Sequence, residues 1–157
     1  MNNVKRILVS VDGGPMDVPA MEFAASFIKK KQAEVFLLYV VEVGRELPLN
    51  ASMESELAKG ELVLDRLLEV GEKAGGRVNP EMLQARSAGA AIVGEALNRK
   101  VDLLVMGMTL KKAFGEFQVS ERVKHVLLNA PCQVWIVRAP LEPEEAPAAG
   151  KSVPASP

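Results

Sequence analysis

An α/β fold is predicted for this chain: an open parallel sheet of five strands with helices on both faces. Five short apolar runs, rich in valine, isoleucine and leucine, are bounded by polar or turn-forming residues, as buried strands are. Four segments with apolar residues at helical spacing separate these runs. Strands that alternate with helices in this way form a parallel sheet whose helices cover both faces.

The first half of the chain supplies two strands and two helices. Strands are expected at residues 4–11 and 35–41, because both runs are too short for a helix and rich in β-branched or aliphatic residues. Asp17 is expected to cap the helix between them. A second helix is expected from about residue 52, with leucines at helical spacing, and the glycine pair at 75–76 ends it.

The second half supplies the other three strands. A weaker strand near residues 82–85 precedes a short helix with Ser87 as its expected cap. A strand at residues 101–106 follows, then a loop, and then the last helix, which Ser120 is expected to cap. The fifth strand is expected at residues 132–137.

One domain followed by a tail accounts for the 157 residues. Residues 1–138 carry all the predicted elements. Residues 139–157 contain five prolines and mostly small or acidic residues. Such a segment buries too little apolar surface to fold, so a flexible tail is predicted.

The composition argues against two classes of partner. The 19 basic and 20 acidic side chains leave a formal charge of −1, without the basic excess typical of proteins that bind nucleic acid. No run of about 18 apolar residues is present that could cross a membrane, and the first residues lead directly into a strand rather than a secretory signal. A cytoplasmic protein with neither nucleic-acid nor membrane partners is expected.

The residues best suited to bind a ligand follow the first, second and fourth strands. Ligands of open parallel sheets bind beyond the carboxyl ends of the strands, where the winding reverses. Asp12 follows the first strand, and its carboxylate suits a base or a ribose, although the same group can stabilise its own turn. Gly107 follows the fourth strand, where a glycine either lets a ligand approach the backbone or simply makes a tight turn.

No catalytic or metal-binding group of residues emerges from the sequence. His125 is alone, without a partner acid or further ligands at a suitable spacing. Ser120 likewise lacks a base, so a helix cap is expected rather than a nucleophile. The chain is therefore expected not to be an enzyme, with no catalytic residues, no metal and no required cofactor. Weak ATPase activity is the one activity left open.

Three blocks of sequence resemble the universal stress protein family. Residues 6–13, Arg-Ile-Leu-Val-Ser-Val-Asp-Gly, resemble the first strand of that family, and residues 105–107, Val-Met-Gly, resemble its fourth. The third block resembles its last helix and strand, and comprises Val-Ser-Glu-Arg-Val at 119–123, Asn-Ala-Pro-Cys at 129–132 and Val-Trp-Ile-Val-Arg at 134–138. The resemblance implies a Rossmann-like sheet of the nucleotide-binding type, with strand order 3-2-1-4-5.

Members of this family that bind ATP carry Gly-x-x-Gly, nine further residues, and then Gly-Ser or Gly-Thr. Only Gly107 matches here, because the second glycine falls on Leu110, the loop is three residues shorter, and Phe117-Gln118 replaces the final pair. The resemblance thus implies a degenerate nucleotide crevice, with an adenine nucleotide as its ligand if it binds one. Its candidate residues are Ser10, Asp12, Val40, Val41, Gly107, Thr109, Lys111, Gln118 and Ser120.

The function expected from the resemblance is that of a universal stress protein, a non-enzymatic regulatory module of the stress response that acts as a homodimer and through protein partners. The alternative is a switch that binds ATP or AMP with weak or no hydrolysis. An ATP pyrophosphatase is disfavoured, because residues 12–17 lack the serines of its phosphate loop. The last strand lies at a sheet edge in the implied order, which makes its apolar residues the candidate dimer interface, namely Val134, Trp135, Ile136 and Val137, with Trp135 as the anchor.

Overall fold

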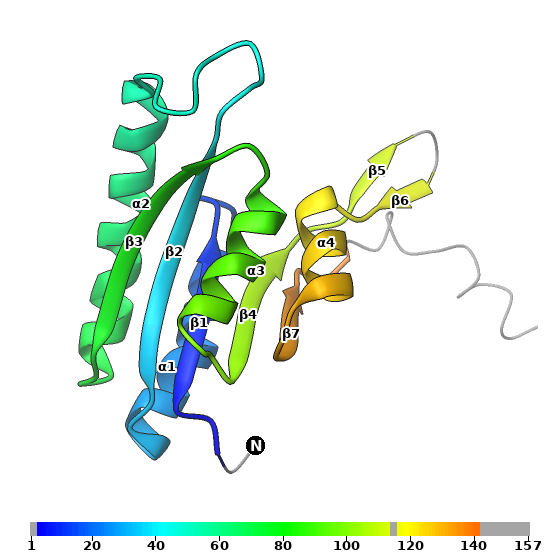
Figure 1. Cartoon of the computed structure of the whole chain (residues 1–157). Coiled ribbons are helices and arrows are strands. Elements are labelled where there is room, and N and C mark those ends of the chain that lie inside the picture. Colours follow the sequence, from blue (N-terminus) through cyan, green and yellow to red (C-terminus); the bar gives the residue numbers. More distant parts are fainter. Residues whose placement is uncertain (1–2, 114–115, 142–157) are drawn as a thin grey trace, which may run out of the picture.

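The computed structural model describes residues 3–113 and 116–141, and its centre is a five-stranded parallel sheet (Figure 1). The strands are β1 (Arg6–Val11), β2 (Glu34–Glu42), β3 (Val78–Ala85), β4 (Leu103–Met108) and β7 (Gln133–Arg138). They lie in the order β3-β2-β1-β4-β7, and each neighbouring pair is parallel. The predicted order 3-2-1-4-5 is therefore confirmed, with β7 as the fifth strand.

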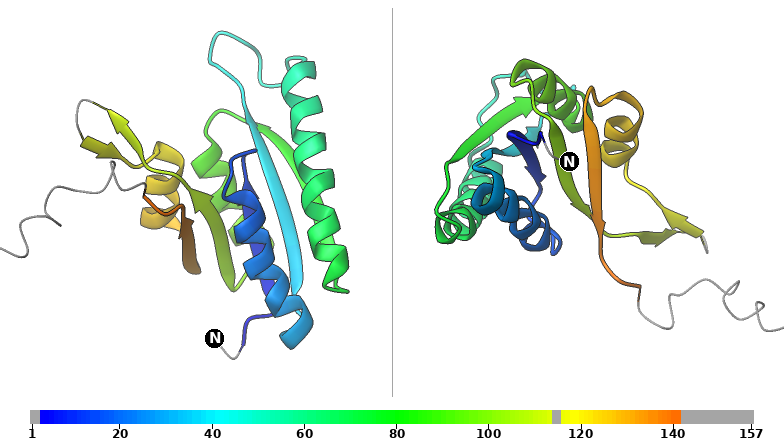
Figure 2. Two further views of the ribbon diagram at one scale, coloured as in Figure 1. Left: turned by 180° about the vertical axis from the view of Figure 1, so that it is seen from behind. Right: turned by 90° about the horizontal axis from the view of Figure 1, so that it is seen from below.

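Two pairs of helices cover the two faces of the sheet. The helices are α1 (Asp17–Lys31), α2 (Glu54–Lys73), α3 (Ala88–Asn98) and α4 (Glu121–Asn129). Figure 2 shows α1 and α2 against one face, and α3 and α4 against the other. Within the described ranges, no helix has both the length and the apolarity needed to cross a membrane.

Successive residues of each central strand enter separate hydrophobic cores on the two faces. In β1, Ile7 and Val9 pack in the core beneath α1 and α2, whereas Leu8 packs in the core beneath α3 and α4. All three side chains are fully buried. Because both faces are covered, the strands are continuous apolar runs rather than alternating ones. This rigid sheet holds the polar residues at the strand ends in place.

Two of the three predicted helix caps are confirmed. The hydroxyl oxygens of Ser87 and Ser120 accept hydrogen bonds from the backbone amides of Ala90 and Val123, each at 3.3 Å. The prediction for Asp17 was wrong. This residue is the first residue of α1 rather than its cap, and its carboxylate turns back toward the preceding loop.

The extent of the third strand also needs correction. It was expected near residues 82–85, but β3 begins at Val78. Its first half contains Asn79, Pro80 and Glu81, which hide the apolar pattern. Such residues are tolerated because β3 is an edge strand of the sheet, and its side chains are mostly half-buried. The limits of the other strands differ from the prediction by no more than two residues.

A short hairpin stands where a loop was expected after β4. Its strands β5 (Lys111–Ala113) and β6 (Glu116–Gln118) pair in antiparallel register. Three-residue strands are too short for periodicity to reveal in a sequence. The hairpin projects away from the sheet on the side of β7 (Figures 1 and 2).

Candidate functional site

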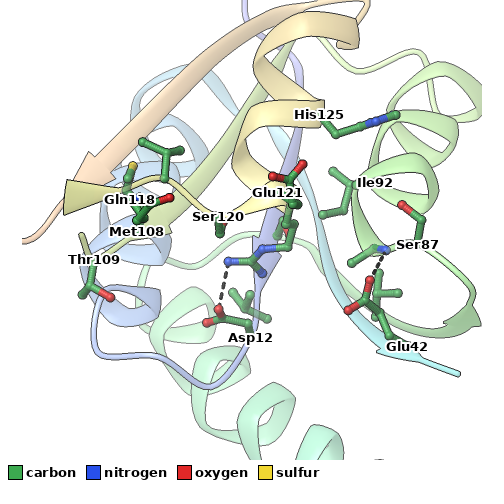
Figure 3. Close-up of a pocket in the computed structure, with 17 residues that line it drawn as sticks. Asp12, Glu42, Ser87, Ile92, Met108, Thr109, Gln118, Ser120, Glu121 and His125 are labelled. Atoms are coloured by element: carbon green, nitrogen blue, oxygen red, sulfur yellow. Dashed lines mark hydrogen bonds and ion pairs between the residues drawn. The ribbon is translucent and has the colours of Figure 1, made fainter. Parts of the chain in front are cut away.

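A crevice of about 610 Å³ opens at the carboxyl ends of β1 and β2, beside the starts of α3 and α4 (Figure 3). Its volume is typical of small-molecule sites, and it lies where the winding of the sheet reverses between β1 and β4. Six of the nine predicted residues line it, namely Ser10, Asp12, Val40, Thr109, Gln118 and Ser120.

Asp12 lies at the end of β1 with both carboxylate oxygens already bonded. Its Oδ1 accepts a hydrogen bond from the amide of Gly14 at 2.9 Å, which stabilises the turn. Its Oδ2 lies 2.8 Å from Nη2 of Arg122, in the first turn of α4. The Asp12 side chain is 51% exposed and that of Arg122 only 18%. The turn-forming role and a role in the crevice are therefore combined in one residue.

Asp17 occupies the backbone amides of the loop that follows β1. Its carboxylate accepts hydrogen bonds from Gly13 N at 2.7 Å and from Asp12 N at 3.3 Å. Burial raises the pKa of Asp17 from 3.8 to about 6, the bond from Gly13 opposes that shift, and the nearby charge of Asp12 adds to it. In this loop the amides that would suit an anionic ligand bind a carboxylate of the same chain.

The amino end of α3 is occupied in a similar way. Glu42, the last residue of β2, accepts a hydrogen bond from the amide of Ala88 at 2.9 Å (Figure 3). The hydroxyl of Ser87 accepts one from the amide of Ala90. At the amino end of α4, Ser120 accepts a hydrogen bond from Val123. The helix ends that face the crevice thus have internal partners for some of their free amides.

Two of the other three predicted residues, Val41 and Gly107, do not line the crevice. Val41 is 3% exposed and packs in the core beneath α1 and α2, because it alternates with Val40. Gly107 lies inside β4, and a Cβ there would come within 2.5 Å of the Cβ of Met16. Close packing against the start of α1 therefore accounts for this glycine. The side chain of Lys111 lies outside the described part of the structure.

Sequence reasoning did not select four charged or titratable side chains that line the crevice, namely Glu42, Glu121, Arg122 and His125. Arg122 lies within the block 119–123 that carried the family resemblance. A residue two positions after a capping serine lies in the first helical turn, next to the strand ends, and that position was the available signal. Together with Asp12, the lining of the crevice carries three carboxylates and one guanidinium.

A parallel sheet with this strand order and a crevice at its switch point defines the α/β proteins of the nucleotide-binding type. The chain belongs to the universal stress protein family, since the sequence model of the Universal stress protein family matches residues 3–138.

Individual proteins agree with this assignment. A universal stress protein of Methanocaldococcus jannaschii is 34% identical over 145 residues, which cover 88% of this chain and 85% of the relative. The solved universal stress protein of Archaeoglobus fulgidus in complex with dAMP has a TM-score of 0.68 and 14% identity, covering 87% of this chain and 99% of that one. A family member from Arabidopsis thaliana with AMP bound has a TM-score of 0.61 and 16% identity, covering 97% and 99%. The two solved structures share the fold with this chain.

Proposed function

We propose that the protein is a non-enzymatic regulatory module of the stress response that works in the cytoplasm as a homodimer and through protein partners. We further propose that its crevice binds the adenosine part of an adenine nucleotide, and binds it weakly. The observation that carries this proposal is that carboxylates of the chain occupy groups of the crevice that would otherwise bind phosphate. The dAMP and AMP complexes of the structural neighbours support an adenine ligand.

Phosphate would have to compete with internal partners in this crevice. The amide of Ala88 already donates to Glu42, and the guanidinium of Arg122 is already paired with Asp12. A phosphate that takes one of these donors forms one bond and breaks another, so the net gain is small. It also leaves a carboxylate near the phosphate without its partner. The adenosine part is uncharged and requires no such exchange.

The same contacts support a role without catalysis. Enzymes that transfer or hydrolyse a phosphoryl group position a nucleophile and gather cations to stabilise the charge that develops. Here the guanidinium of Arg122 is paired with Asp12, and the hydroxyl oxygen of Ser120 accepts a hydrogen bond from the amide of Val123. Glu42 and Glu121 add negative charge to the lining.

The β7 edge supports the homodimer. One side of β7 pairs with β4 from Gln133 to Arg138, and no strand of the described ranges pairs with its other side. An apolar unpaired edge favours addition of another chain, and two β7 strands related by a twofold axis would form a self-complementary contact. Trp135 stacks on Phe23 with 4.7 Å between ring centroids and is half-buried, so the rest of its ring would serve as the anchor.

Titration calorimetry of the full chain with adenosine tests the ligand, with uridine as the matched control. Adenosine should bind and uridine should not. A chain that gives no signal with adenosine at millimolar concentration would overturn the proposed ligand. Mass spectrometry of the native protein, purified without added nucleotide, then identifies any adenine nucleotide that co-purifies.

A nucleotide-dependent switch with weak or no hydrolysis is the second candidate function. Arg122 is the observation that favours it, because a guanidinium that is 18% exposed in the crevice is well suited to a phosphate. Sub-micromolar affinity for ATP that is lost in Asp12→Ala would support the switch over the weak adenosine site.

A further inference from the structure

Asp12 and Arg122 face each other across the crevice. Asp12 lies at the carboxyl end of β1 and Arg122 in the first turn of α4, and the two are 110 positions apart in the chain. The bond between Oδ2 of Asp12 and Nη2 of Arg122 is 2.8 Å long, and its dashed line spans the space below Ser120 in Figure 3. Arg122 provides the guanidinium that faces the crevice within the described residues.

We propose that the Asp12–Arg122 ion pair is a latch that sets which adenosine derivatives the crevice accepts. Nucleosides without phosphate bind while the latch is closed. A monophosphate binds only by withdrawing Arg122 from Asp12, and a triphosphate is disfavoured further. This inference rests on the proposed adenosine site, and it assigns phosphate discrimination to Arg122 as controlled by Asp12.

The guanidinium of Arg122 can exchange the carboxylate of Asp12 for a phosphate at a modest cost in free energy. A guanidinium presents several donors in a planar fork that matches a phosphate as well as a carboxylate. When Arg122 leaves, Asp12 remains about half exposed, and water can solvate the freed oxygen. The latch can therefore open, but opening it uses part of the binding energy of the phosphate.

A triphosphate meets additional resistance in the crevice. Its further negative charges would approach the carboxylates of Glu42 and Glu121, which line the same space. Like charges at short range oppose one another. Among the described lining residues, Arg122 is the side chain with a fixed positive charge that offsets them. The order of preference is therefore adenosine first, AMP second and ATP last.

The turn after β1 can survive opening of the latch. The other oxygen of Asp12, Oδ1, accepts a hydrogen bond from the amide of Gly14 at 2.9 Å, and that bond does not involve Arg122. An asparagine at position 12 keeps an oxygen for the same bond but has no negative charge to hold the guanidinium. Asp12→Asn is therefore expected to fold normally with Arg122 released.

Three variants of the full chain test the latch: Asp12→Asn, Glu121→Gln, and Asp12→Asn combined with Arg122→Gln. The first two each remove one negative charge from the lining, but Glu121 contacts Lys124 rather than Arg122. Calorimetry at fixed ionic strength gives the ratio of AMP affinity to adenosine affinity for each protein. The ratio should rise roughly 10-fold in Asp12→Asn, by less than about 2-fold in Glu121→Gln, and return to the wild-type value in the double variant.

Inorganic phosphate is a second probe that does not depend on adenosine. Its stabilising effect on the melting temperature, relative to chloride at equal ionic strength, should increase in Asp12→Asn and not in the double variant. Equal affinity ratios and equal phosphate effects in Asp12→Asn and Glu121→Gln would overturn the latch while leaving the adenosine site intact. If no variant binds adenosine but phosphate stabilises Asp12→Asn alone, the proposed ligand fails and the latch holds.

Discussion

The crevice and the β7 edge differ in whether their polar groups have hydrogen-bond partners within the chain. In the crevice, the amide of Ala88 donates to the carboxylate of Glu42, and the guanidinium of Arg122 pairs with that of Asp12. Along β7, one row of backbone groups pairs with β4, whereas the other row meets no strand in the described ranges. Polar groups that already have partners resist a new one, and groups without partners favour one. One molecule is therefore expected to combine strong self-association with weak phosphate binding.

The largest effect is expected from Ile136→Pro at the β7 edge. Proline has no N–H group and is poorly accommodated in a paired strand, so the variant should lose the dimer and run as a monomer or aggregate. Light scattering at micromolar concentration measures the mass. Ile136→Val is the matched control, because it keeps the N–H group and should remain dimeric. A wild-type protein that is monomeric at this concentration contradicts the contrast between the two regions.

The next effect concerns the carboxylate that occupies the amides after β1. The pKa of Asp17 rises from 3.8 in the unfolded chain to about 6 in the folded one. The folded state thus binds the proton more tightly, and the stability associated with this group is present below pH 4 and lost as pH rises through 6. This loss amounts to at most about 3 kcal/mol.

Urea denaturation of wild type and Asp17→Asn at several pH values between 4 and 7 isolates this contribution. The variant cannot ionise at position 17, so wild type should lose stability relative to the variant as pH rises across this range. The other acidic groups cancel in the difference. A difference that is the same at every pH would mean that the pKa of Asp17 is not raised, and that the bonds from the loop amides offset the cost of burying its charge.

A smaller effect is expected when ATP and adenosine are compared in the wild-type crevice. ATP should bind with a dissociation constant above about 100 μM, and adenosine should match it within about 10-fold. The combination of Phe117→Gly and Gln118→Ser should improve ATP binding only in part, since Leu110 and the short loop remain. Calorimetry with both ligands on both proteins checks this. Tight ATP binding by the double variant would show that the loop, and not the internal carboxylates, weakens the binding of phosphate.

The fold was predictable because its signals are local or simply periodic. Strands buried on both faces appear as apolar runs, and Ser87 and Ser120 mark the helices that they cap. An aspartate at the start of a helix suits either the cap or the first turn, so the position of Asp17 was misjudged. The pair of Asp12 with Arg122 joins residues 110 positions apart, and no local pattern predicts such a contact.

The smallest effect is expected from removing the segment beyond β7. A chain that ends at residue 141 keeps the hydrogen bond from the amide of Ala139 to the carbonyl of Met108, at 3.1 Å, whereas a chain that ends at residue 138 loses it. Both should melt within about 5 °C of the full chain, which corresponds to roughly 1 kcal/mol, because residues 139–157 are rich in proline and poor in large apolar side chains. Both should also remain dimeric in light scattering, since the pairing edge of β7 is retained. A larger drop in melting temperature would show that the segment packs on the domain. A rise in the mass of the truncated chains would show that the segment covers the β7 edge, and the contrast between a satisfied crevice and an open edge would then fail.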